Sequence, residues 1–346
     1  MIHTPGGYLI LPKCLWWALH RGVNPNTGEQ WGASTADPRT FKSVEDVMNA
    51  FYEQVRFFSQ KLVRMENASR VIYQKFLPRP FLSSLLDDCI ERGQDGRSWE
   101  HSPSLNHFIM IGPTNVIDSL AVIRKYIFDE KKVSMVELIS ILDNNWEGHE
   151  ALRQRILSGS PKYGNDDDYV DQIAREVHCK VASILEECKS NFGVSFHCDG
   201  SGVSANYGLA LECLATPDGR RDQDPFSDAT LSPRPGADVC GPTAVLASAA
   251  KMGASFNELF NQKFQPQFLE GEYKEIFYSY LKTWADLGIP HIQFNIVDKA
   301  TLLDAQKHPE KHSDLIIRVA GYSAYFTDLS RGLQDHIIER TEQKFQ

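Results

Sequence analysis

Apolar residues recur at helical spacing in two stretches of the chain, and each stretch opens with a capping pattern. Ser43 and Asp46 have the spacing of a capping box at the start of residues 43–62, and Ser134 and Glu137 repeat it farther along. Both stretches are therefore predicted to be amphipathic helices. The apolar positions on their buried stripes are Val47, Phe51, Val55, Phe58 and Leu62 in the first, and Leu138, Ile141 and Leu142 in the second.

A polar run at residues 165–168, Asn-Asp-Asp-Asp, precedes a third apolar-periodic stretch at residues 170–185. Three consecutive acids are compatible with a metal site. They are also what a helix N-terminus attracts, because its unpaired amide groups and its dipole favour negative charge. We therefore interpret this run as a helix cap.

Farther along, residues 200–242 are rich in Gly, Pro and Asp and show little periodicity. Pro217, Asp218 and Gly219 form a strong turn signal. Long irregular segments are uncommon inside compact chains and are often functional. We predict a domain boundary here, with residues 1–218 in one domain and residues 219–346 in the other.

The last part of the chain predicts strands again. Residues 291–297 alternate between apolar and polar positions, as in a half-buried strand, while residues 301–307 suit a short helix and residues 315–319 a second strand. This order predicts a parallel pair of strands and an α/β fold. A final helix is predicted after Ser330. The alternating positions are Ile292, Phe294 and Ile296 on one face, and Gln293 and Asn295 on the other.

Composition and charge narrow the classes of function. The 346 residues are 42% hydrophobic, and their formal net charge of −9 argues against nucleic-acid binding, which needs a clustered basic face. No apolar run is long enough to cross a bilayer, so no membrane partner is expected. Seven cysteines without regular spacing fit a reducing cytoplasm. Common metal and nucleotide motifs, such as Cys-x-x-Cys and the P-loop, do not occur in the sequence.

One segment near the C-terminus carries a more specific pattern. Residues 318–326 read Arg-Val-Ala-Gly-Tyr-Ser-Ala-Tyr-Phe. On its own, Gly321 is explained as a glycine at a strand end, where it permits a turn or a close backbone approach. With residues 329–341 included, the segment resembles the signature of the glycyl radical enzymes. That family includes pyruvate formate-lyase, B12-independent glycerol dehydratase and choline trimethylamine-lyase.

Further segments resemble the same family in the same order, so the resemblance covers essentially the whole chain. It implies the C-terminal half of a glycyl radical enzyme α/β barrel with surrounding helices. Residues 1–218 would be the C-terminal part of the barrel domain, and residues 219–346 the glycine radical domain. The additional segments are residues 161–167, 217–221, 238–239, 241–245, 291–298 and 304–311.

The resemblance also implies a chemistry, in which Gly321 stores a radical on its Cα. Such a radical is delocalised over the flanking amide nitrogen and carbonyl when the carbon is planar, and a side chain would crowd that centre. A separate radical S-adenosylmethionine enzyme installs the radical, so neither a bound cofactor nor a metal is expected. The other residues of the radical loop are Arg318, Val319, Tyr322, Ser323 and Phe326.

The stored radical must pass to a cysteine, and the family's Gly-Cys-Val-Glu-like loop has no counterpart in this sequence. Residues 4–22 resemble the stretch just after that loop. Cys14 lies in an apolar run and is interpreted as a packed side chain, while Cys240 matches no catalytic position. We assign no catalytic cysteine. The chain is expected to be incomplete alone, as a fragment, a spare part, or a subunit beside an N-terminal half that carries the cysteine.

The resemblance leaves more than one function open. Ser323 resembles the dehydratase and decarboxylase branch, because pyruvate formate-lyases usually have alanine after Gly-Tyr. The leading interpretation is an oxygen-sensitive lyase of anaerobic metabolism, homodimeric when complete, that cleaves a C–C, C–O or C–N bond. The alternatives are formate C-acetyltransferase and a non-catalytic spare part that repairs another lyase. Diols, choline, hydroxyproline and aryl acetates are the candidate small-molecule substrates.

Overall fold

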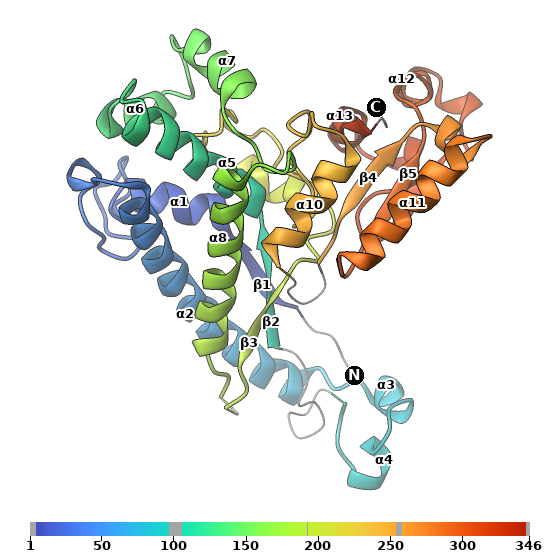
Figure 1. The fold of residues 1–346 in the computed structure, drawn as a ribbon. Helices are drawn as coiled ribbons and strands as arrows, with labels where there is room; N and C mark the ends of the chain where they lie inside the picture. The colour runs from blue at the N-terminus through green and yellow to red at the C-terminus, as the bar shows by residue number, and fades with distance from the viewer. Residues whose placement is uncertain (1–4, 97–105, 192, 254–257, 344–346) are drawn as a thin grey trace.

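The computed structural model describes residues 5–96, 106–191, 193–253 and 258–343, so Thr4 lies outside the described residues. Short strands are separated by one or more helices along most of the chain (Figure 1). Across the described ranges, no helix combines the length and apolar character that crossing a bilayer requires.

The helices are α1 Leu11–Leu19, α2 Val44–Phe76, α3 Pro80–Ser84, α4 Cys89–Arg92, α5 Pro113–Ile123, α6 Met135–Asp143, α7 Glu150–Gly159, α8 Asp168–Glu187, α9 Ala205–Gly208, α10 Pro242–Met252, α11 Tyr273–Asp286, α12 Lys299–Lys307 and α13 Arg331–Glu339. The strands are β1 Pro5–Ile10, β2 Asn106–Ile111, β3 Phe196–Asp199, β4 Asn261–Phe264, β5 Gln293–Ile296, β6 Ile316–Arg318, β7 Ser323–Tyr325 and β8 Glu342–Gln343.

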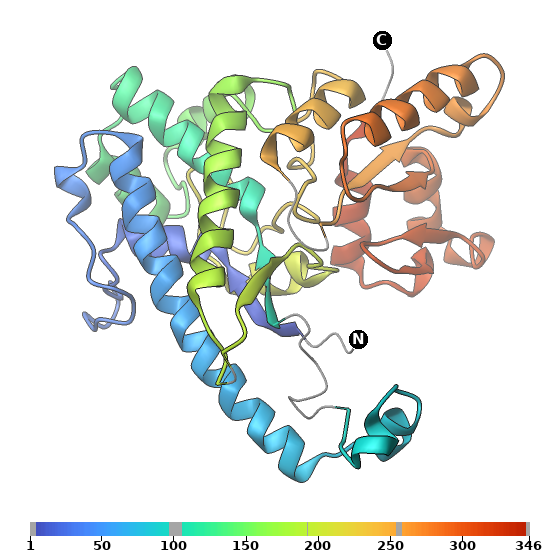
Figure 2. The same ribbon diagram turned by 60° about the horizontal axis from the view of Figure 1, so that its bottom comes forward.

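The first three strands form a parallel sheet in the order β1-β2-β3. The register places Leu9 opposite Met110 and Phe108 opposite Cys198, so these side chains share one face of the sheet. Helices α2 and α8 lie along this face (Figures 1 and 2), and the side chains between helices and sheet form the large apolar core. Phe108 stacks on Phe196 there, with ring centroids 4.7 Å apart.

The predicted helices are confirmed where local signals are strong. α2 begins after Ser43 with both bonds of the capping box and continues to Phe76, well beyond the predicted end. α6 begins after Ser134, whose hydroxyl accepts the backbone N–H of Glu137 at 3.1 Å. The helix after Ser330 also forms, as α13.

The acidic run at residues 165–168 caps a helix, as expected. Asp167 is the N-cap of α8, and its carboxylate accepts the backbone N–H of Tyr169 at 2.9 Å. The Nζ of Lys251 on α10 lies 2.6 Å from a carboxylate oxygen of Asp166 and 2.7 Å from one of Asp168. The acids therefore also hold α10 against the start of α8.

The predicted parallel pairing of residues 291–297 with residues 315–319 is wrong. β5 pairs in parallel with β4, in a second sheet of order β5-β4-β8, whereas β6 pairs antiparallel with β7. The reason is a sharp turn at Gly321, where a φ of +76° folds the chain straight back on itself. β7 is therefore the strand that pairs with β6, and β5 pairs with β4 instead.

The second sheet has faces of different polarity, and its polar face is buried. Phe264 and Phe294 lie on one face, where Phe264 packs against Phe277 of α11 with ring centroids 5.3 Å apart. The opposite face carries four polar side chains that are each at most 8% exposed. These are Asn261, Lys263, Gln293 and Asn295.

Residues 297–341 are inserted between two strands of this sheet, β5 and β8. We call these residues the C-terminal module. The chain leaves the sheet at the end of β5 and returns as β8, on the other side of β4. Between these points it builds α12, β6, β7 and α13 around an apolar cluster that is separate from the large core (orange to red in Figure 1). The buried members of this cluster are Val297, Leu302, Ala305, Ile317, Val319, Phe326, Leu333, Ile337 and Ile338.

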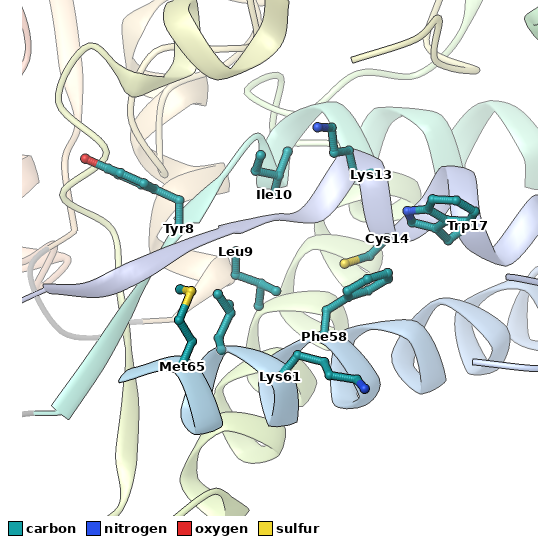
Figure 3. A pocket seen from close by; sticks show the side chains of 10 residues that line it. Tyr8, Leu9, Ile10, Lys13, Cys14, Trp17, Phe58, Lys61 and Met65 are labelled. Carbon is teal, nitrogen blue, oxygen red and sulfur yellow. The ribbon is translucent and has the colours of Figure 1, made fainter. Parts of the chain in front are cut away.

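A groove of about 240 Å³ runs between the β1–α1 segment and α2, beside the edge of β1 that no described strand covers. Figure 3 shows Leu9, Cys14, Phe58 and Met65 converging on it, while Tyr8 points away. Cys14 is only 2% exposed, which confirms its interpretation as a packed side chain. Burial raises the pKa of its thiol to about 12.

Replacing Phe108 with alanine tests the packing of the first sheet. Because Phe108 is fully buried, we expect Phe108→Ala to lower the free energy of unfolding by about 3–5 kcal/mol in urea denaturation. Phe81→Ala on α3 is the matched control, since Phe81 is 79% exposed and should lose less than about 0.5 kcal/mol. Equal losses in both variants would contradict the assignment of Phe108 to the core.

Candidate functional site

The segment that contains Gly321 is a tight antiparallel hairpin. Arg318 at the end of β6 lies opposite Ser323 at the start of β7. Between them, the backbone N–H of Val319 donates to the carbonyl of Tyr322 at 2.9 Å, which closes the turn. Gly321 therefore lies at the tip of the hairpin, and it is exposed on the surface of this chain.

Glycine is required at this tip because of its backbone conformation, since there is enough room for a small side chain. A Cβ built on Gly321 would meet only Leu259 Cδ1, at an ordinary contact distance of 3.8 Å. Its φ of +76° lies in the left-handed region, where an L-residue loses roughly 1–2 kcal/mol. Alanine at this position would thus fit sterically but strain the loop.

Two amide side chains from β5 bind the hairpin backbone. The Gln293 Oε1 accepts the Gly321 backbone N–H at 3.2 Å and the Arg318 Nε–H at 2.9 Å. Asn295 accepts the Arg318 backbone N–H at 2.7 Å and donates its Nδ2 to the Arg318 carbonyl at 2.6 Å. The polar face of β5 therefore fixes both the glycine and the residue that ends β6.

A buried ion pair holds the other side of the loop. The Arg340 guanidinium donates to the carbonyl oxygens of Val319, at 2.6 Å, and Arg318, at 3.3 Å. Its Nε lies 2.8 Å from a carboxylate oxygen of Asp228, which also accepts the Asn261 Nδ2–H at 2.7 Å. Burial lowers the pKa of Arg340 and the Asp228 carboxylate opposes that shift, so the guanidinium stays charged.

The structure brings the predicted loop residues together around Gly321. Val319 and Phe326 are buried in the apolar cluster of the C-terminal module, and Tyr322 packs against its edge. The Arg318 side chain bonds to Gln293 and, at 3.3 Å, to the hydroxyl of Ser323. Ser323 is exposed.

Four residues of the site were not predicted as functional: Asp228, Gln293, Asn295 and Arg340. A signal for two of them was present, because amides at alternate positions of a strand need hydrogen-bond partners on whichever face they occupy. Asp228 and Arg340 come from distant parts of the sequence, and only the folded chain brings them together.

The seven cysteines of the chain are unpaired. Burial raises the pKa of Cys198 well above its usual value, as it does for Cys14, so these two thiols are held in the protonated form. Cys240 is exposed. Among the described residues outside its chain neighbours, only Leu259 comes within 4 Å of the Cβ position at Gly321, so no cysteine approaches that position.

Two known families match the chain, and the boundary between the two matches falls within the irregular segment. Residues 1–210 match the pyruvate formate lyase-like family, and residues 227–327, which include Gly321, match the glycine radical family. The chain belongs to the glycyl radical enzymes. The expected fold, part of a glycyl radical enzyme α/β barrel, is confirmed by the solved structures that the chain resembles.

Curated relatives of this glycyl radical chain are dehydratases and lyases. It is 37% identical over 342 residues to trans-4-hydroxy-L-proline dehydratase of Clostridioides difficile, covering 98% of this chain and 43% of that enzyme. It is 36% identical over 351 residues to isethionate sulfite-lyase of Desulfovibrio desulfuricans, covering 98% and 42%. These two relatives are thus a dehydratase and a lyase, and neither is a pyruvate formate-lyase.

Solved structures of the family superpose closely on the chain. The B12-independent glycerol dehydratase from Clostridium butyricum matches with a TM-score of 0.90 and 34% identity, covering 98% of this chain and 43% of that one. A structure described for 1,2-propanediol dehydration in Roseburia inulinivorans matches with a TM-score of 0.90 and 38% identity, covering 97% and 43%. The chain therefore spans about 43% of these relatives' length.

Acid should loosen α13, the helix that ends just before Arg340, because it contains the buried His336. Burial, together with the Arg340 charge, lowers the pKa of His336 to about 4, against an ordinary value of 6.5. Between these two values the unfolded chain binds a proton that the folded chain does not. We therefore expect the free energy of unfolding to fall as the pH drops from 6.5 towards 4, by at most about 3 kcal/mol.

Urea denaturation across this pH range, on wild type and His336→Leu, measures the effect. The variant should lose stability less steeply with acid, since the carboxylates that titrate in the same range are common to both proteins. Parallel stability profiles would show that His336 does not contribute.

Proposed function

We propose that Gly321 is the residue on which this chain stores an organic radical. The observation that carries the proposal is the hairpin tip itself, a glycine with a φ of +76° inside the segment that matches the glycine radical family. Gln293 and Arg340 bind the backbone on either side of it. A Cα without a side chain can become planar there, while its supports remain in place.

We further propose that the complete enzyme is a lyase that cleaves a C–C, C–O or C–N bond of a small molecule in anaerobic metabolism. The names of the relatives, a hydroxyproline dehydratase and a sulfite-lyase among them, support elimination chemistry. The match of residues 1–210 to the barrel family favours a catalytic part over a repair protein that supplies only a radical domain.

The radical is proposed to come from a separate radical S-adenosylmethionine enzyme, as membership of the family implies. That enzyme removes one hydrogen atom from the Gly321 Cα. The stored radical then takes the hydrogen atom of a cysteine thiol, which restores the glycine and leaves a thiyl radical to react with the substrate. Residues of this chain position the glycine, and we propose that they bind no further cofactor.

We propose that the reacting cysteine belongs to polypeptide outside this chain. Gly321 is exposed here, whereas a stored radical needs protection from solvent and oxygen, so a further polypeptide must cover it. The groove beside β1 gives that polypeptide a docking surface, with apolar side chains such as Leu62 and Met65 and a free strand edge.

The remaining expectations are proposals as well. We place the domain boundary near residue 218, between the two family matches. The unpaired cysteines fit a reducing cytoplasm. The complete enzyme is proposed to be a homodimer.

Electron paramagnetic resonance tests the radical site. After anaerobic incubation with a cognate activating enzyme, reductant and S-adenosylmethionine, the chain should give a doublet, because a glycyl radical retains one α-hydrogen. Gly321→Ala should lose the doublet. Gly288→Ala is the matched control, since Gly288 also has a positive φ, of +68°, but lies outside the hairpin.

Two outcomes would contradict the proposal. One is the absence of a doublet when the same activating enzyme works on another glycyl radical protein. The other is an activated sample that stays intact in air, because dioxygen should cut the backbone at the radical and release a peptide from Tyr322 to Gln346.

Reconstitution tests the docking surface. The chain is titrated with the cysteine-bearing remainder of the Clostridioides difficile dehydratase, and binding is followed by isothermal titration calorimetry. Leu62→Glu with Met65→Glu should weaken binding at least about tenfold, since two charges would be buried in an apolar contact. Val136→Glu on α6, where Val136 is 53% exposed and outside the groove, is the control. If the wild-type chain does not bind this remainder of the dehydratase, the docking proposal is wrong.

A further inference from the structure

We infer that Gln293 is the positioning residue for the Gly321 radical, an inference that rests on Gly321 being the radical site. A single oxygen, Gln293 Oε1, accepts both the Gly321 backbone N–H and the Arg318 Nε–H. Of the described side chains, Gln293 is the one that bonds directly to the glycine backbone. It therefore touches the amide group that shares the unpaired electron.

The bond to Gly321 belongs to a closed circuit. Gln293 donates its Nε2 to Asn261 Oδ1, and Asn261 donates its Nδ2 to Asp228 at 2.7 Å. Asp228 pairs with Arg340 at 2.8 Å, and Arg340 donates to the carbonyl of Val319 at 2.6 Å. The circuit thus starts at the Gly321 N–H and returns to the loop at the Val319 carbonyl. It therefore binds the peptide groups on both sides of Ala320.

Burial makes this circuit rigid. Gln293, Asn261, Asp228 and Arg340 are each at most 8% exposed, so water does not compete for their bonds. A buried polar group that loses its partner destabilises the fold, and the members of such a network strengthen one another. Gly321 lies at the one exposed point, where solvent would otherwise take its N–H.

The orientation of that N–H matters to the radical for an electronic reason. The amide nitrogen shares spin density with the Cα only when the plane of the peptide aligns with the plane of the radical carbon. At a φ of +76° the two planes are far from aligned, so formation of the radical requires rotation about the N–Cα bond. Gln293 holds the plane of the Ala320–Gly321 peptide fixed while the Cα rotates relative to it. The hydrogen bond that Gln293 accepts also increases the electron density at the Gly321 nitrogen.

A structural role alone makes a different prediction. If Gln293 only stabilised the fold, its loss would loosen many amides together and would leave the radical spectrum unchanged. A positioning role confines the change to Gly321, and an acceptor of similar length should restore the wild-type behaviour.

Hydrogen exchange on the chain labelled with 15N-glycine separates these roles. In Gln293→Leu the amide exchange of Gly321 should rise about tenfold, as expected for the loss of one hydrogen bond. Gly288 is an internal control, because its N–H donates to Ala285 far from the hairpin. Gln293→Glu keeps an acceptor and should restore protection at Gly321. Gln306→Leu, which removes a bond between α12 and α13, should not affect it.

Equal amide exchange of Gly321 in wild type and in a folded Gln293→Leu protein would overturn the inference. If Gln293→Leu fails to fold, Gln293→Glu becomes the test. Loss of Gly321 protection in a folded Gln293→Glu protein would then overturn the inference.

Electron paramagnetic resonance supplies the second readout. Gln293→Leu should change the splitting of the doublet and shorten the lifetime of the radical, while Gln293→Glu should resemble wild type. An unchanged doublet would also overturn it. Absence of the wild-type doublet would instead refute Gly321 as the radical site, and exchange would still report on the contact.

Discussion

The C-terminal part of the molecule depends on one constraint, the burial of four polar side chains on a single face of the β5-β4-β8 sheet. A buried donor or acceptor must find a partner. Asn261 donates a hydrogen bond to Asp228, and Gln293 and Asn295 bind the backbone of the hairpin. Lys263 donates to the carbonyl of Ile338 on α13 at 3.2 Å, and burial lowers its pKa to about 8. The hairpin holds its place because its backbone supplies the partners that this face requires.

Sequence reasoning succeeded where the signal was local. The capping box at Ser43 and the cap at Ser134 marked helix starts correctly, because capping involves residues within one turn of each other. The resemblance to the glycyl radical enzymes is confirmed by the family matches over residues 1–210 and 227–327, whereas the role of Gly321 stays a prediction.

Sequence reasoning failed where the answer depended on contacts between distant segments. The partner of β5 is β4, a strand of four residues whose mixed polarity gives no strand signal. The alternation of β5 was read correctly, but no local rule shows that its amide face turns inwards, since polar faces usually meet solvent. The partnership of Asp228 with Arg340 exists only after the C-terminal module has folded back on the sheet.

The way in which the C-terminal module is inserted has a mechanical consequence. Its entry after β5 and its exit into β8 flank β4, and it encloses an apolar cluster of its own. Its contacts with the rest of the chain include polar bonds from Gln293, Asn295 and Asp228, the packing of Tyr207 against its cluster, and a small cluster of Ala229, Leu259 and Ala320. Apolar packing therefore holds the interior of the module together, whereas its attachment to the sheet depends largely on directional bonds between buried polar groups.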